Sequence, residues 1–155
     1  MGPQVRIAGL EDVPVLVSLM AEFYEEAGYS LCQDSASKAF TALLGEPNRG
    51  RIWLIEVKGG AVGYLALTLG FSMEYGGLRG FVDDFFVRSS VRERGLGGAA
   101  LQAVKEACRD LDVRALLVET GPENRSVRGI YARAGFEDSG RVLLSQALAP
   151  RIHET

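Results

Sequence analysis

The chain has few cysteines, a single histidine and no long apolar run. Cys32 and Cys108 are its two cysteines, and they form neither a disulfide framework nor a metal-ligand spacing, which fits a reducing compartment. A cysteine nucleophile would need a histidine partner, and the single histidine, His153, lies near the end of the chain. No apolar run approaches the roughly 20 residues of a membrane span. We therefore expect a cytoplasmic protein that holds no metal and does not cross a membrane.

The chain also lacks a basic stripe. Its 17 lysines and arginines are outnumbered by 20 aspartates and glutamates, which gives a net charge of −3. Nucleic acid binding depends on clustered positive charge, so we expect no nucleic acid partner and favour a cationic one. Residues 1–11 lack the basic and apolar regions of a signal peptide. The length of 155 residues, with 47% hydrophobic residues, predicts one globular domain over residues 1–155.

Apolar periodicity and turn residues predict the element order β-α-α-β-β-β-α-β-α-β. The predicted strands are residues 4–8, 51–57, 61–69, 80–87, 113–120 and 141–148. The predicted helices are residues 12–27, 35–44, 95–111 and 126–134. Residues 70–79 are expected to form a loop and residues 150–155 a frayed end. This order implies an α/β fold with a mixed sheet flanked by helices.

A glycine-rich segment, residues 95–98 (GLGG), follows the strand at 80–87 and begins a helix. The first N–H groups of a helix lack intrahelical partners, and the helix dipole favours negative charge there. Glycine has no Cβ, so a phosphate can approach the main chain closely. Arg88, Arg92 and Arg94 lie in the same loop and add positive charge. The segment therefore predicts a pyrophosphate site.

Residues 95–100 also fit the dinucleotide fingerprint G-x-G-x-x-[GA], with Glu119 near the distance of a ribose-binding carboxylate. In a dinucleotide fold, however, the first glycine directly follows the strand, and here the charged residues 88–94 intervene. Only about one further strand–helix–strand unit fits beyond Glu119. A dinucleotide-binding oxidoreductase is therefore a disfavoured alternative. A Walker phosphate loop is disfavoured too, because no Gly-Lys-[Ser/Thr] follows the glycines.

Two sequence blocks resemble the GNAT superfamily of acetyl-CoA-dependent N-acetyltransferases. Residues 92–97 (RERGLG) match the coenzyme A loop [QR]-x-x-G-x-[GA], and Asn124 with residues 131–136 (YARAGF) is similar to the block N-x(6)-Y-x-x-x-G-F. Residues 83–87 (DDFFV) further resemble a strand of the polyamine (spermidine/spermine) acetyltransferases. The resemblance implies the GNAT fold, acetyl-CoA as cosubstrate and direct transfer of the acetyl group to an amine.

The resemblance also implies roles for particular residues. Tyr131 corresponds to the general acid that protonates the departing thiolate, and a phenol with a pKa near 10 stays protonated at neutral pH. A backbone N–H near Phe86 or Val87 would polarise the thioester carbonyl. The residues expected to bind the cofactor are Phe86, Val87, Arg88, Arg92, Glu93, Arg94, Gly95, Leu96, Gly97, Gly98, Asn124 and Tyr131.

Two carboxylates are candidates for the base that deprotonates the amine. The polyamine resemblance favours Asp83, acting through water, and Glu119 at the end of the next strand is the alternative. Strand alternation predicts that Asp83 and Asp84 face opposite sides of the sheet, so that one of them at most faces the site. The structural alternative for both candidates is an ion pair with an arginine such as Arg79 or Arg128.

Aromatic and acidic residues at the end of the first helix are candidates for the acceptor pocket. Tyr24, Tyr29 and Tyr75, together with Asp83, would suit a cationic amine, although a solvated helix end is the simpler interpretation. The expected substrate is therefore the primary amine of a small molecule, polyamine or amino-acid-like. A non-catalytic acyl-CoA sensor on the same fold is the alternative. Related domains often pair through sheet edges or last strands, so the resemblance also suggests a homodimer.

Overall fold

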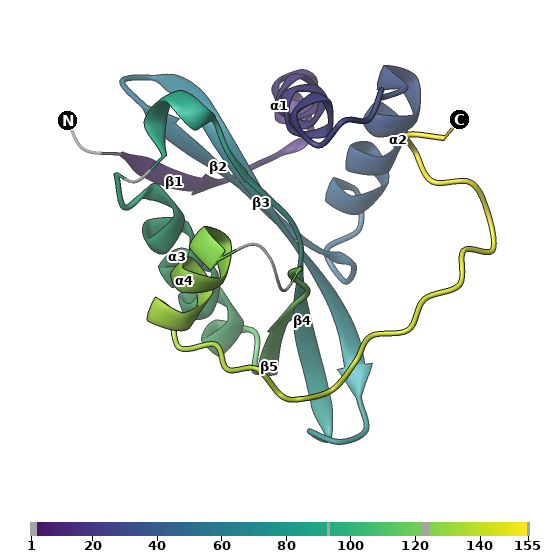
Figure 1. Ribbon diagram of the computed structural model, residues 1–155, viewed down its shortest axis with the longest axis vertical. Helices are drawn as coiled ribbons and strands as arrows, with labels where there is room; N and C mark the ends of the chain where they lie inside the picture. Colours follow the sequence, from purple (N-terminus) through teal and green to yellow (C-terminus); the bar gives the residue numbers. More distant parts are fainter. Residues whose placement is uncertain (1–2, 93, 122–124, 155) are drawn as a thin grey trace.

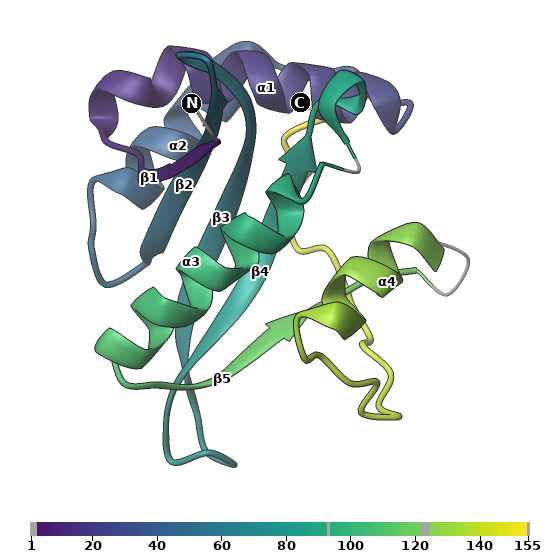
Figure 2. The same cartoon turned by 90° about the vertical axis from the view of Figure 1, so that its left-hand side faces the viewer.

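A mixed five-stranded sheet divides the protein into two helical layers in the computed structural model, which describes residues 3–92, 94–121 and 125–154 (Figure 1). The strands follow the order β1-β2-β3-β4-β5, antiparallel except for the parallel pair β4–β5. Helices α1 and α2 cover one face, while α3 and α4 lie on the other (Figures 1 and 2). The elements are β1 Gln4–Ile7, α1 Val13–Glu26, α2 Gln33–Leu44, β2 Gly50–Val57, β3 Gly60–Ser72, β4 Gly77–Val87, α3 Leu96–Asp110, β5 Val113–Val118 and α4 Arg125–Arg133.

The central strands are apolar on both sides because each side has its own helical layer. In β2, Ile52 and Leu54 pack in the cluster with α1 and α2, whereas Trp53 and Ile55 pack in the cluster with α3. In β3 the alternation is the same, with Tyr64 facing α1 and Leu65 facing α3. Side chains of a strand alternate between faces, so a strand that is covered on both faces has a continuous apolar sequence.

Strands β4 and β5 separate part of the way along β4. Their paired residues run from Leu78 with Val113 to Val82 with Val118, and β4 then continues to Val87 without a β5 partner. At the same point β4 contains a β-bulge, since Leu67 pairs with Val82 and Ala66 with Asp84. The last residues of β4 therefore have one backbone edge that faces away from β3 and is not paired with a strand of the described chain.

The predicted element order is confirmed as far as α4, and three local predictions are wrong. Residues 141–148 form no strand. Residues 70–79 are not a long loop, because β3 and β4 continue as a paired ribbon to a short turn between Ser72 and Gly77. The end of the chain is not frayed throughout: Ile152 packs against the α1–α2 cluster. No helix in the described part of the chain is long and apolar enough to cross a membrane.

Candidate active site

The glycine-rich segment begins α3, as the sequence predicts. Gly95 is the N-cap with φ of 77°, a left-handed conformation that glycine adopts without a Cβ penalty. The first intrahelical bond runs from the N–H of Ala99 to the carbonyl of Gly95 at 3.1 Å. A Cβ on Gly97 would lie 3.3 Å from Phe85, whereas a Cβ on Gly98 would meet nothing within 4 Å. The preceding N–H groups of the helix start are thus available for an anion, and the space at Gly98 is open.

A cavity of about 930 Å³ lies between β4, α3 and α4, next to the end of α1. Of the predicted cofactor-binding residues, Phe86, Val87, Arg92, Gly95, Leu96, Gly97, Gly98 and Tyr131 line it. Arg88 and Arg94 are not among the described lining residues, and Glu93 and Asn124 lie outside the described part of the chain. The cavity is also lined by residues that were not among the predicted cofactor-binding residues: Phe23, Glu26, Phe85, Val91, Gln102, Lys105, Val127, Gly129, Ile130, Arg133 and Ala134.

Two loop arginines are held by carboxylates of α1. Arg88 makes two hydrogen bonds to Glu22, at 2.9 and 2.7 Å. Arg92 donates to Glu26 at 2.6 Å and, through Nε, to the carbonyl oxygen of Val87 at 2.8 Å. Glu22 and Glu26 lie one helical turn apart on α1, and each holds one of the two arginines. Helix α1 therefore positions the loop that leads into α3. Glu26 thereby places a carboxylate at the wall of the cavity.

Tyr131 is buried at the wall of the cavity, with 7% of its surface exposed. Its ring lies 6.2 Å from that of Phe85 and 5.4 Å from that of Phe136, measured between centroids. The N–H of Phe136 donates to the carbonyl of Tyr131 at 3.0 Å after a turn at Gly135, where φ is 100°. Burial raises the pKa of the Tyr131 phenol to about 12. The hydroxyl is therefore protonated at neutral pH.

The bulge in β4 brings Asp83 and Asp84 into range of the same aromatic side chains. The Tyr64 hydroxyl donates to Asp84 at 2.9 Å, and burial raises the pKa of Asp84 to about 6. Asp83 is more exposed, and partial desolvation also raises its pKa. Burial, and then the charges of Asp84 and Asp83, raise the pKa of Tyr24 to about 12. The bulge adds a residue and interrupts the alternation on which the opposite placement of the two carboxylates was based, so that placement stays a prediction.

No arginine or lysine in the described part of the chain forms an ion pair with Asp83 or Asp84. Arg128, one of the partners considered from the sequence, lies 3.7 Å from Asp138. Asp84 belongs to the quoted motif at residues 83–87, but it was not among the candidate bases predicted from the sequence. With no cationic partner among the described residues, the two carboxylates concentrate negative charge at the bulge of β4.

Glu119 lies at the same junction, directly after the end of β5. Val82 and Val118 form the last β4–β5 pair; Asp83 follows it within β4, and Glu119 is the first residue after the end of β5. The Glu119 side chain is exposed and is not among the described residues that line the cavity. The structure thus places both candidate bases where the strands separate.

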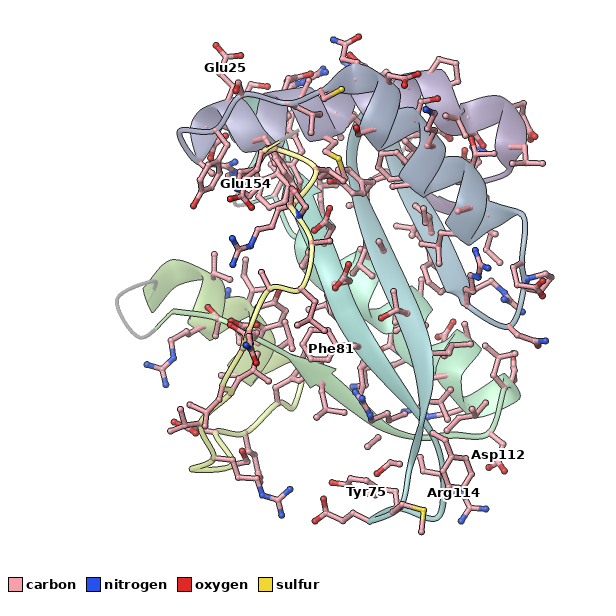
Figure 3. All side chains as sticks on the ribbon, turned by 90° about the vertical axis from the view of Figure 1, so that its right-hand side faces the viewer. Glu25, Tyr75, Phe81, Asp112, Arg114 and Glu154 are labelled. Atoms are coloured by element: carbon pink, nitrogen blue, oxygen red, sulfur yellow. The ribbon has the colours of Figure 1, made fainter. Side chains whose placement is uncertain are left out.

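The three candidate tyrosines of the acceptor pocket do not lie together. The rings of Tyr24 and Tyr29 are 6.4 Å apart, and His153 packs on both, at 5.8 and 4.2 Å between centroids. Tyr75 lies at the tip of the β3–β4 ribbon, at the opposite end of the molecule from Glu25 and Glu154 (Figure 3). The sequence did not indicate that His153 packs on Tyr24 and Tyr29, because these tyrosines are more than 120 residues away from it in the chain.

The described residues contain no group of three or more histidine, cysteine, aspartate or glutamate side chains that could hold a metal ion. The described residues combine a cavity lined by the glycine-rich start of α3 and by Tyr131 with carboxylates near the point where β4 and β5 separate. Comparison with known proteins agrees: the model of the acetyltransferase (GNAT) family matches residues 16–136. The chain belongs to the GNAT family and is an N-acetyltransferase of that family.

Several known proteins are similar over most of the chain. The uncharacterized N-acetyltransferase YhfO of Bacillus subtilis is 25% identical over 135 residues, 87% of this chain and 88% of that protein. An integron cassette protein from the mobile metagenome of Cole Harbour Salt Marsh is 66% identical, with a TM-score of 0.91 over 97% of this chain and 94% of that one. A predicted acetyltransferase of Clostridium acetobutylicum, solved with acetyl-CoA, shares the fold at 16% identity, with a TM-score of 0.78 over 94% and 96% of the two chains.

Proposed function

We propose that this enzyme transfers the acetyl group of acetyl-CoA to the primary amine of a small molecule by direct attack, without a covalent enzyme intermediate. The observation that carries the proposal is the cavity of about 930 Å³, which brings together the glycine-rich start of α3, the open edge of β4 and the Tyr131 side chain. Phosphate groups fit a helix start that has free N–H groups and no side chain at Gly98.

The described residues suggest how the cosubstrate is held. The N–H groups of Leu96, Gly97 and Gly98 would bind the pyrophosphate. The unpaired backbone edge of β4 would accept the pantetheine amides as a neighbouring strand would. Contacts from Arg88, Glu93, Arg94 and Asn124 stay predictions from the family resemblance.

Of the two predicted oxyanion donors, backbone geometry favours Val87 over Phe86. The N–H of Arg88 donates to Val62 of β3 at 2.7 Å. Because N–H groups alternate along a strand, the N–H of Val87 points to the opposite, open edge. The carbonyl of Val87 accepts from Arg92 on that edge. The Val87 N–H is therefore suitably placed to stabilise negative charge on the thioester oxygen.

The reaction requires two proton movements. Acetyl-CoA supplies the acetyl group as a thioester; the amine nitrogen forms a bond to the carbonyl carbon, and the carbon–sulfur bond breaks. Asp83, or alternatively Glu119, removes a proton from the nitrogen through water, and Tyr131 donates a proton to the sulfur. Asp84 is a third carboxylate in this region, and its raised pKa of about 6 suits a base.

The acceptor is proposed to be cationic before it is deprotonated. Asp83 and Asp84 supply negative charge, and Tyr24 and Tyr29 supply aromatic faces at the adjoining end of α1. Polyamines, amino acids and aminoglycosides share this chemistry, and a fold neighbour at 17% identity is an aminoglycoside N-acetyltransferase, AAC(6')-Iy. Tyr75 lies too far along the sheet to join this acceptor site. A homodimer and a cytoplasmic location also stay predictions.

The test is amine-dependent release of the free coenzyme A thiol from acetyl-CoA. A panel of polyamines, amino acids and aminoglycosides is assayed, and the acetylated amine is identified by mass spectrometry. We expect release with at least one amine and an acetylated product. Binding of coenzyme A without release for any amine would instead favour a non-catalytic acyl-CoA sensor.

A further inference from the structure

The cavity of the candidate active site extends along α3 beyond its glycine-rich start and is bounded there by α4, on the face of the sheet that carries both helices (Figure 2). Gly98, Gln102 and Lys105 line it, and their spacing of four and three residues places them on one face of α3. Gly129 and Arg133 line the cavity from α4. We call the region lined by Gln102, Lys105, Gly129 and Arg133 the distal part of the cavity.

The distal part of the cavity is positively charged. The charged residues that line the whole cavity are Glu26, Arg92, Lys105 and Arg133. Glu26 and Arg92 form an ion pair with each other at 2.6 Å, so their charges offset. Among the described residues, no carboxylate forms an ion pair with Lys105 or Arg133. The distal part therefore carries two positive charges that the described part of the chain does not neutralise.

Lys105 and Arg133 reach the same end of α4. The half-buried Lys105 donates from Nζ to the carbonyl oxygen of Ala134 at 3.0 Å, next to Arg133 in the chain. An ammonium group has three donors, so two remain for another acceptor. The guanidinium of Arg133 folds back along α4, since a Cβ on Gly129 would lie 3.3 Å from its Nη1. Both side chains thus present donors to the distal part of the cavity.

A structural role explains only part of this arrangement. Helix α4 ends at Arg133, and the dipole of a helix favours positive charge at its C-terminal end. The bond from Lys105 to Ala134 also ties α4 to α3. Arg133, however, makes no hydrogen bond or ion pair within the described part of the chain. Two cations at the wall of one cavity, with donors left over, suit an anionic group of a ligand.

We propose that Lys105 and Arg133 bind the 3′-phosphate of coenzyme A, the phosphate monoester on its ribose. The inference rests on the proposed function, which places the pyrophosphate at the start of α3. The ribose follows the pyrophosphate in coenzyme A, and Lys105 lies about 10 Å from Gly98 along the helix axis, at about 1.5 Å per residue. A phosphate monoester carries a charge of about −1.5 to −2 at neutral pH, which two cations match. The enzyme would then select coenzyme A over forms that lack this phosphate.

The test is calorimetric titration of the full-length protein with coenzyme A and with 3′-dephospho-coenzyme A, which differ by this one phosphate. We expect the natural sequence to bind coenzyme A at least about tenfold more tightly, because hydrogen bonds between charged groups are lost with the phosphate. Lys105→Gln and Arg133→Gln should each bring the two dissociation constants closer together. They should do so by weakening coenzyme A binding, while binding of the dephospho form stays unchanged.

Arg109→Gln is the matched control. Arg109 is an exposed cation of α3 that is not among the described residues lining the cavity, and the substitution removes the same charge. It should leave the ratio of the two dissociation constants unchanged.

Two results would overturn the inference while the proposed function stands. One is equal affinity of the natural sequence for the two forms. The other is an equal loss of affinity for both forms in Lys105→Gln and Arg133→Gln, which would assign these side chains to the packing of α4 on α3. Failure of both forms to bind would instead overturn the proposed function, and this inference with it.

Discussion

Tyr64 on β3 donates a hydrogen bond to Asp84 on β4 at 2.9 Å, and this contact holds a carboxylate within the sheet beside the proposed acceptor site. Tyr64 is fully buried, and burial raises the pKa of Asp84 to about 6. The hydrogen bond from Tyr64 opposes this effect, whereas the charge of Asp83 adds to it. The charged form of the Asp84 carboxylate therefore destabilises the fold at neutral pH, and the hydrogen bond from Tyr64 offsets part of this cost.

Asp84→Asn should stabilise the protein in a pH-dependent way. The pKa of Asp84 is higher in the folded state than in the unfolded state, so the carboxyl group disfavours folding once pH rises from about 4 through 6. At pH 8 the variant should be more stable than the natural sequence by about 1 to 3 kcal/mol, and below pH 4 this advantage should vanish. Urea unfolding at both pH values measures it. An equal difference at the two pH values would indicate altered packing instead of ionisation.

Tyr131→Phe should lower turnover by about 10²- to 10⁴-fold, the usual contribution of a general acid, while acetyl-CoA binding changes little. The variant keeps the ring that packs against Phe85 and Phe136. Steady-state kinetics and calorimetric titration separate the two effects. Tyr75→Phe, at the distant tip of the ribbon, is the control and should retain full activity. Equal loss of turnover and binding would remove Tyr131 from the role of general acid.

The pH dependence of the rate should identify the base. If Asp83 deprotonates the amine, the rise of kcat/KM with pH is lost in Asp83→Asn and kept in Glu119→Gln. Partial desolvation raises the pKa of Asp83, so the rise should lie above the range of an ordinary aspartate. The reverse pattern would select Glu119. A rise that both variants keep and Asp84→Asn loses would assign the base to Asp84.

Gly98→Ala should increase stability and weaken cosubstrate binding. A Cβ at this position meets nothing within 4 Å, and alanine in a helix is more stable than glycine by about 0.5 to 1 kcal/mol. The same methyl group would occupy the space through which phosphate reaches the N–H groups, so the dissociation constant for acetyl-CoA should rise by about tenfold. The exposed neighbour Ala99→Gly should show the opposite, with lower stability and unchanged binding. Unchanged binding in Gly98→Ala would place the pyrophosphate elsewhere.

The elements from β1 to α4 could be predicted because their signals are local. Apolar residues at helical spacing, alternating or continuous apolar strands and glycine at turns all lie within a few residues of one another. The same holds for the start of α3, where Gly95 and the helix that follows depend on neighbouring residues.

The remaining features depend on contacts between distant parts of the chain. The relation of Asp83 to Asp84 is set by a bulge opposite Ala66 and Leu67, which strand alternation does not reveal. A strand at residues 141–148 needs a partner edge as well as an apolar pattern. The position of Tyr75 depends on how far the β3–β4 ribbon extends. The packing of His153 on Tyr29 is a contact between the end of the chain and the end of α1, which no local pattern indicates.

The most direct test of the central claim, that this protein binds acetyl-CoA in the cavity beside Tyr131, is thermal unfolding with acetyl-CoA, coenzyme A, NAD and ATP in parallel. A ligand of the native state at a hundred times its dissociation constant adds about 2.7 kcal/mol to the free energy of unfolding. We expect both coenzyme A forms to raise the unfolding temperature, and the rise to be smaller in Gly98→Ala. A rise with NAD and none with acetyl-CoA would contradict the account.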